Sequence, residues 1–297
     1  MTKLPAALSA LILIAISALA LAAPVVAPYS ARDQFREHGY APPQALYFRD
    51  PGTGRFERPF FYGANGQKVR LRLLVSGTPY QVLGIGLQTR LFGTRVSDPP
   101  FFLLGSDSLG RDVFSRTLHG ARFTLTISVL GIACTLLFGV GFGLLAGYAG
   151  GWIDSATMRM ADLLLSLPGL FLVLGLRAVF PLELSVANLY LLMTAIFTLA
   201  AWGGVARVIR GQALSLKSRD HVQAARTLGA SHGRILLVHI LPFTTNYLIV
   251  QMTILVPAFI LGEITLSFLG VGIQEPNVSW GTLLNAAASI STFTLYP

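Results

Sequence analysis

Charged side chains are scarce in this chain. Aspartate, glutamate, lysine and arginine make up 12% of its 297 residues, whereas a soluble domain carries about 25%. The chain contains several apolar runs that almost lack charged residues. These runs are long enough to cross a bilayer, which requires about 20 residues. We therefore predict an integral membrane protein. The net charge of +9 indicates cytoplasmic loops rather than nucleic-acid binding, because the basic residues do not gather on one soluble region with aromatic residues between them.

Cysteine and recognisable catalytic motifs are also nearly absent. Cys134 is the single cysteine. It can form no disulfide within the chain and no cysteine-based metal cluster, so we interpret it as a small packing residue. The sequence contains no GxxxxGK(S/T) loop for nucleotide phosphates, no HExxH and no GxSxG. Its five histidines do not pair at metal-ligand spacing. We predict no catalytic residue, metal site or cofactor, and the chain is not expected to be an enzyme.

The first apolar run covers residues 4–28 and follows Lys3. It has two interpretations. Its alanine-rich end offers small-residue cleavage sites, which are typical of a secretory signal peptide. The run is also long enough, without a charge, to be a retained membrane helix over 1–28 that ends at Pro24 and Pro28.

Residues 29–121 differ sharply from this run. Polar and turn-forming residues dominate, and fragments such as KVRLRLLV and PYQVLGIGL are typical of short strands. The sequence FRDPGTGRFERPFFYG predicts a hairpin in which Gly52 and Gly54 supply the turn. We therefore predict a strand-and-turn region outside the membrane.

The rest of the chain predicts an all-α membrane domain over 122–297. Four further spans are expected at about 123–148, 160–180, 187–208 and 243–269, which gives about five with the first. Between the second and third spans, residues 150–162 are predicted as a short polar connection. Pro168 and Gly169 predict a kink in the third span.

Three glycines in the second span recur every four residues and share one helix face: Gly139, Gly143 and Gly147. Such a face lets another helix approach closely in the membrane, although glycine is also simply tolerated there. Arg177 and Glu183, at the far end of the third span, are expected to anchor it at the interface. Glu263, in the fifth span, is expected to act at the interface or in helix packing.

The connection between the fourth and fifth spans predicts which side of the membrane each loop occupies. It is short and strongly basic, with Arg207, Arg210, Lys217, Arg219, Arg226 and Arg234. The positive-inside rule therefore places 209–242 in the cytoplasm. Counting back across the spans places 29–121 outside and the N-terminus inside.

Within this connection, residues 219–242 predict a short helix, a turn and a second helix. Val222, Ala225 and Leu228 fall at three-residue spacing and form a narrow apolar face. Gly229 is suited to end the helix in a left-handed conformation, and Ser231 to cap the next one. The short helix could be a handle gripped by a partner protein or an amphipathic helix resting on membrane lipid.

The sequence QAARTLGASHGRILLVHILP resembles the EAA coupling motif of permease subunits in bacterial ABC importers. The matching positions are Ala224, Ala225, Gly229, Ile235, His239, Leu241 and Pro242. Gln223 stands where the family has glutamate, which removes one charge. Two further stretches resemble the C-type subunit of the dipeptide/oligopeptide/nickel family: GSDSLGRDVFSRTLHGARFTL at 105–125 and GEITLSFLGVGIQEPNVSWGTLL at 262–284.

The resemblance implies a bacterial inner-membrane, multi-pass subunit that forms half of a translocation path, for peptides as the family's commonest cargo. The implied partners are a second permease subunit, two ATP-binding subunits and an extracytoplasmic substrate-binding protein. The implied ATPase-coupling residues are Asp220, Val222, Gln223, Ala224, Ala225, Leu228, Gly229 and Ala230.

The family pattern also implies a sixth helix that would begin near 294–297, so the last helix is expected to be missing. This leaves a second hypothesis open. The chain could be a membrane anchor or scaffold that transports nothing and whose region 29–121 binds a partner.

Overall fold

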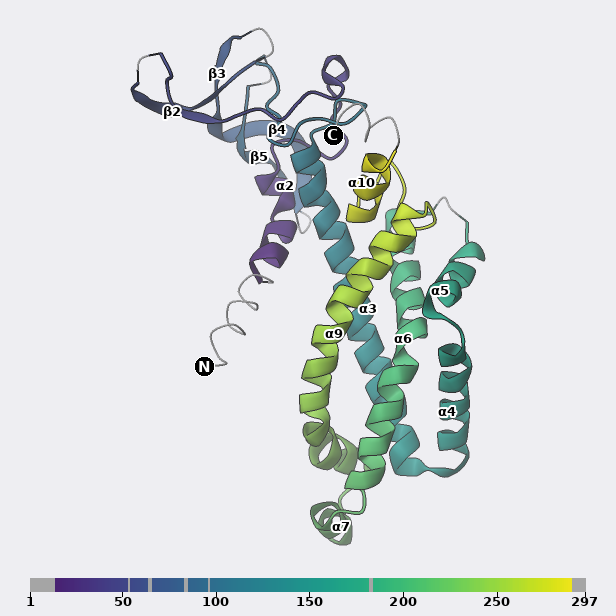
Figure 1. The fold of residues 1–297 in the computed structure, drawn as a ribbon. Helices are drawn as coiled ribbons and strands as arrows, with labels where there is room; N and C mark the ends of the chain where they lie inside the picture. The colour runs from purple at the N-terminus through teal and green to yellow at the C-terminus, as the bar shows by residue number, and fades with distance from the viewer. Residues whose placement is uncertain are drawn as a thin grey trace. The chain divides into compact units, whose positions relative to one another are not determined.

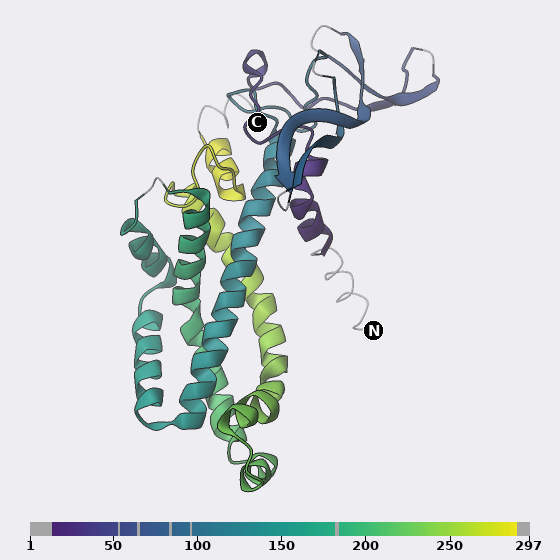
Figure 2. The same cartoon turned by 180° about the vertical axis from the view of Figure 1, so that it is seen from behind.

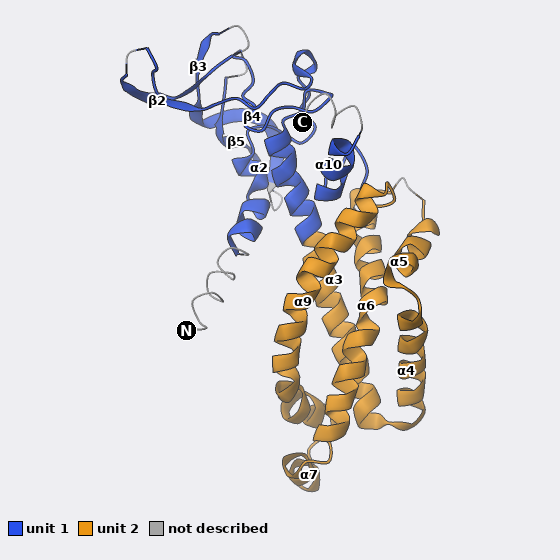
Figure 3. Cartoon of the chain, viewed as in Figure 1, with its two compact units in different colours: residues 1–125, 273–297 blue, residues 126–272 orange. Residues whose placement is uncertain are grey.

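The computed structural model describes residues 14–52, 54–63, 66–82, 85–95, 97–181 and 184–289. The chain divides into two compact units (Figure 3). The first unit contains residues 1–125 and 273–297, and the second contains residues 126–272. One long helix, α3 (Val113–Ala149), begins in the first unit and continues into the second.

The first unit combines short helices with five antiparallel strands. Residues 14–21 are helical. The elements that follow are α2 (Ala23–Val26), η1 (Arg36–His38), β1 (Tyr47–Arg49), β2 (Phe56–Tyr62), β3 (Lys68–Arg70), β4 (Arg72–Val82), β5 (Ile85–Gly93), the start of α3, and α10 (Trp280–Ala287). The strands predicted from the sequence are therefore present. Residues 1–13 of the predicted first span lie outside the described residues.

The strands form two small sheets. One has the order β1-β2-β3 and the other pairs β4 with β5. The predicted hairpin is confirmed: β1 and β2 pair antiparallel, with Tyr47 opposite Phe60, and Gly54 has φ +67°. Phe61 and Val69 of the three-stranded sheet are buried against Phe101.

Four charged side chains form a cluster around the start of α3. Arg116 is 1% exposed and pairs with Asp107 and Glu275. Arg111 pairs with the same two carboxylates, at 2.7 Å and 2.8 Å. Burial opposes ionisation of Asp107, but hydrogen bonds from Arg111 and the nearby arginine charges outweigh it and lower its pKa. The contribution of Asp107 to stability is therefore present at neutral pH and lost as the pH falls through this lowered pKa.

Replacing Arg116 with glutamine should destabilise the first unit. The change leaves Asp107 and Glu275, whose side chains are 17% and 48% exposed, sharing Arg111 alone. Breaking a fully buried pair costs about 3–5 kcal/mol, and this partly exposed one should cost less, about 2 kcal/mol. Thermal unfolding in mild detergent measures the effect. Arg70→Gln is the matched control. Arg70 lies 3.9 Å from Glu57, and its side chain is 67% exposed, so its loss should cost less than about 1 kcal/mol. Equal losses for the two variants would contradict the expectation.

The second unit is a bundle of helices (Figure 1). After the remainder of α3 come α4 (Gly151–Ser166), α5 (Gly169–Ala178), α6 (Val186–Leu216), α7 (Asp220–Thr227), α8 (His232–Arg234), η2 (Ile235–Ile240) and α9 (Leu241–Phe268). Among the described residues, three helices are long and apolar enough to cross a membrane: Val113–Ala149, Val186–Leu216 and His232–Phe268. A fourth span results if the pair α4 and α5 is counted as one.

The structure corrects the prediction for residues 150–162, which are not a polar connection. Gly150 and Gly151, both at positive φ, make the turn after α3 on their own, and α4 begins at once. The polar side chains that suggested a loop face α6 instead: Asp154 accepts a hydrogen bond from Arg210 at 2.6 Å, and Asp162 pairs with Arg207.

The predicted kink at Pro168 is a full break. The axes of α4 and α5 differ by 94°, because a proline at this point cannot continue the hydrogen-bond ladder of α4. Arg177 is buried and donates to the carbonyls of Phe180 and Pro181 at 3.1 Å and 3.0 Å. It therefore caps the end of α5. Glu183 lies outside the described residues.

The glycine stripe of α3 faces α6. A methyl group at Gly139 would lie 2.6 Å from the Cβ of Val205. At Gly143 it would lie 2.6 Å from the carbonyl oxygen of Ala206, and Gly147 is equally close to the backbone of α6. A real Cβ atom is not found at such short distances. The backbones of α3 and α6 can approach this closely because the glycine stripe carries no side chains.

Candidate functional site

The helix α7 lies between α6 and α9 in sequence and packs by one narrow face. Val222 and Ala225 are buried. Val222 packs in a cluster with Ile209 of α6 and Ile235 of η2. Leu228 does not belong to this face. It is 87% exposed, because it ends the helix and the chain turns away there. The predicted apolar face therefore consists of two residues rather than three.

The turn after α7 follows a well-defined hydrogen-bond pattern. The amide of Gly229 donates to the carbonyl of Arg226, and the amide of Ala230 donates to that of Ala225, both at 3.0 Å. Gly229 has φ +80°, which a residue with a side chain rarely adopts. This is a Schellman motif, and it confirms the predicted helix end.

The next helix starts where the sequence predicted. Ser231 caps α8 by accepting from the amide of Arg234. The chain then widens into the π-helix η2 before α9. Pro242 lies at the start of α9. Its ring would collide with the carbonyl four residues earlier in a regular helix, and the wider preceding turns relieve this crowding.

The end of α3 holds α7 in place from the side. Tyr148 receives a hydrogen bond from Arg226 at 3.3 Å, and its hydroxyl lies 2.7 Å from Nδ1 of His232. The guanidinium of Arg226 also lies 5.7 Å from the centre of the Tyr148 ring. Lys217 donates to the carbonyl of Gly147 at 3.0 Å. Sequence reasoning missed Tyr148, because nothing in its neighbourhood pairs it with residues more than 70 positions later.

The outward side of α7 is free of these contacts and exposed. It presents six of the residues expected to take part in coupling, namely Asp220, Gln223, Ala224, Leu228, Gly229 and, partly, Ala230. Gln223 also donates from its side-chain amide to the carbonyl of Lys217 at 2.9 Å. A glutamate could not donate this bond, so the departure from the family pattern has a structural role at the end of α6. A small, mostly uncharged surface on an anchored helix suits protein docking.

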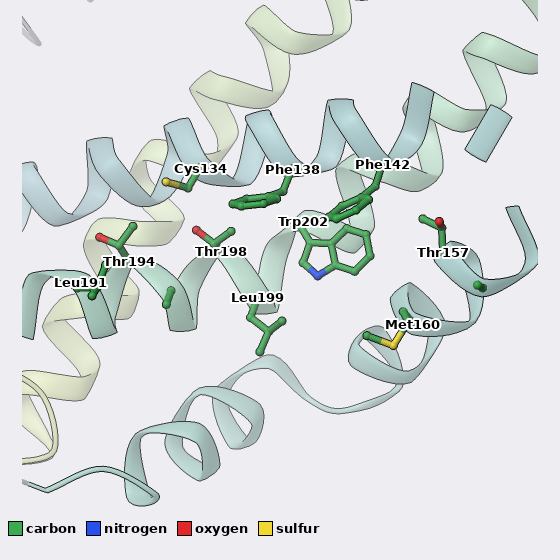
Figure 4. Close-up of a pocket in the computed structure, with 12 residues that line it drawn as sticks. Cys134, Phe138, Phe142, Thr157, Met160, Leu191, Thr194, Thr198, Leu199 and Trp202 are labelled. Carbon is green, nitrogen blue, oxygen red and sulfur yellow. The ribbon is translucent and has the colours of Figure 1, made fainter. Parts of the chain in front are cut away.

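A separate cavity of about 580 Å³ lies among α3, α4 and α6 (Figure 4). Phe138, Phe142 and Trp202 contribute aromatic walls, and Thr198 is a polar residue among them. Cys134 also lines this cavity. The described residues contain no group of three or more histidine, cysteine, aspartate or glutamate side chains placed to hold a metal ion.

These elements define a helical integral membrane protein with an exposed, anchored helix between two long apolar ones. Residues 139–296 match the family described as binding-protein-dependent transport system inner membrane component. The chain belongs to this family.

Several curated relatives align with the chain. It is 45% identical over 181 residues to the dipeptide transport system permease protein DppC of Bacillus subtilis, covering 61% of this chain and 55% of the relative. It is 40% identical to the oligopeptide transport system permease protein OppC of the same organism, over 65% and 61% of the two chains. The glutathione transport system permease protein GsiD of Pectobacterium atrosepticum is 39% identical, over 63% and 60%. The chain thus spans less than two thirds of the length of these relatives.

Proposed function

We propose that the chain is a transmembrane permease subunit of an ATP-driven ABC importer for peptides, and that it forms half of the translocation path. The relatives with dipeptide, oligopeptide and glutathione in their names support a peptide cargo. In this proposal residues 1–28 form the first membrane helix, 29–121 lie outside the cytoplasm, and 122–297 form the permease domain. ATP is hydrolysed in two partner subunits, and an extracytoplasmic binding protein delivers the cargo to this subunit and a second permease.

The anchored but exposed helix α7 is the observation that carries the coupling step. Its inner face is buried through Val222 and Ala225, whereas its outer face is open to a partner. A docked ATPase that changes conformation displaces α7 and, through the buried face, the helices beside it. The glycine stripe contributes by holding α3 against α6, so that the two helices move together.

The orientation follows from the basic connection around α7. Residues 209–242 lie in the cytoplasm and the N-terminus on the same side, in the inner membrane of a bacterium. Membrane lipid surrounds the long helices, whose outward side chains are largely apolar.

Transport assays test the proposal. The chain is co-expressed with the second permease, the ATPases and the binding protein, reconstituted into proteoliposomes, and supplied with ATP inside and labelled dipeptide outside. We expect ATP-dependent uptake that requires the binding protein. Assembly of the complex without uptake of any peptide would overturn the transport function and favour a non-transporting scaffold.

A further inference from the structure

The β4–β5 hairpin has two chemically different faces. Side chains alternate along β5, so Ile85, Leu87 and Leu91 share one face, and all three are exposed, Ile85 by 64%. Leu74 is also exposed and lies on β4 between Leu73 and Val75, which pair with Phe92 and Arg90 of β5. We call these four residues the aliphatic row. Their exposure leaves an apolar strip on this face of the hairpin, with Thr89 between Leu87 and Leu91.

The other face is fixed to the end of the N-terminal helix by Arg90. This residue is buried, and its guanidinium donates to the carbonyl of Ala27 at 3.0 Å and to that of Pro24 at 3.5 Å. It also donates to Oγ1 of Thr78 across the hairpin at 2.7 Å. The final carbonyls of a helix have no hydrogen-bond partner within the helix. Arg90 donates hydrogen bonds to two of them and so attaches the hairpin to the last helical turn.

The hydrogen bonds of Arg90 fix the position of the hairpin along the axis of the N-terminal helix. Figure 2 shows the hairpin curving down beside α2 within the first unit. The helix before α2 exposes apolar side chains such as Ile14 and Leu21, and the apolar run ends at Pro28. A helix that crosses the bilayer leaves its hydrocarbon region at such a point. In the proposed insertion, the aliphatic row therefore lies near the level of the bilayer boundary, on the hairpin face opposite Arg90.

We propose that the aliphatic row is a lipid-contact surface that seats the hairpin in the outer interface of the membrane. Its chemistry favours lipid over a protein partner. Protein interface cores are enriched in tyrosine, tryptophan, methionine and arginine, whereas the four residues of the row are aliphatic. Tyr80, which pairs with Leu87 in the strand register, suits the membrane interface, where tyrosine is enriched. Arg72, exposed at the open end of the hairpin beside Leu73, supplies a cation that suits lipid phosphates.

The inference rests on the proposed membrane insertion of the first apolar run, and the experiment separates the two. Single cysteines are introduced in a Cys134→Ala background at Leu87, at Ile14 and at Phe56. Phe56 is an equally apolar residue of β2 that is 84% exposed but belongs to the other sheet. Each variant of the full chain is labelled with bimane and placed in phosphatidylcholine nanodiscs, with or without brominated acyl chains.

Brominated lipid should quench the labels at Leu87 and Ile14 strongly and leave the label at Phe56 bright, whereas aqueous iodide should quench only Phe56. Leu91→Cys, in the same row, is the second position and should behave like Leu87.

If Ile14 is quenched by lipid and both row positions behave like Phe56, the inference is wrong although the helix is inserted. If Ile14 is also unquenched, the proposed insertion fails as well. If the row is protected from both quenchers once the other transporter subunits are bound, it is a protein interface and the inference is wrong.

Discussion

Replacing Ala224 with arginine is expected to abolish docking of the ATP-binding subunits while leaving the membrane domain folded. Ala224 is exposed on the outward side of α7 and makes no part of the buried face. A long side chain at this position keeps the two docking surfaces apart. Docking would also remove its charged guanidinium from water without providing a partner. A loss of at least about 2 kcal/mol is typical of residues central to an interface, which weakens association by well over tenfold. Co-purification of the ATPases and peptide-stimulated ATP hydrolysis report the two expected losses.

The matched control is Ala287→Arg. Ala287 is an exposed alanine near the end of another short helix, α10. This variant adds the same side chain to the same type of position without touching α7, and it should retain full association. Normal association of Ala224→Arg would show that α7 is not the docking element. A loss in both variants would point to a general effect of the added charge.

Replacing Gly143 with alanine is expected to destabilise the second unit, although alanine is the better helix former. The added methyl would lie 2.6 Å from the carbonyl oxygen of Ala206 and 2.8 Å from the Cβ of Ile209. Neither backbone can yield easily, so α3 and α6 must separate. Overpacking of this kind costs about 1–3 kcal/mol. The melting temperature in detergent and the yield of monodisperse protein measure the effect.

Gly141 supplies the control on the same helix. No described atom outside its own helix neighbourhood lies within 4 Å of a Cβ built there. Gly141→Ala should therefore be neutral or stabilising by up to about 1 kcal/mol, through helix propensity alone. A Gly143 variant as stable as the Gly141 variant would show that the close approach of α3 and α6 is not required.

Local patterns allowed the short-range features to be predicted. The alternation or clustering of apolar residues in the fragments KVRLRLLV (68–75) and PYQVLGIGL (79–87) predicted strands. Gly229 and Ser231 predicted the end of one helix and the start of the next, since each acts through its own backbone or its nearest neighbours. The buried pair Val222 and Ala225 followed from helical spacing alone.

Features that depend on partners far along the chain could not be predicted in this way. Asp154 and Asp162 made α4 resemble a loop, because their arginine partners lie more than 40 positions away on α6. Leu228 fits the apolar spacing, but the turn that exposes it depends on Gly229. The same limit applies to the α7 surface that we propose as the ATPase-docking site. Its residue types are visible in the sequence, whereas the contact between Arg226 and Tyr148 that supports it is not.

The contacts of α7 with the end of α3 have a mechanical consequence. Lys217 and Arg226 join α7 and its preceding turn to Gly147 and Tyr148, while the helix is already continuous in sequence with α6 and leads into α9. A force applied to α7 is therefore distributed over three long helices instead of two. The short helix therefore connects the ends of three long helices.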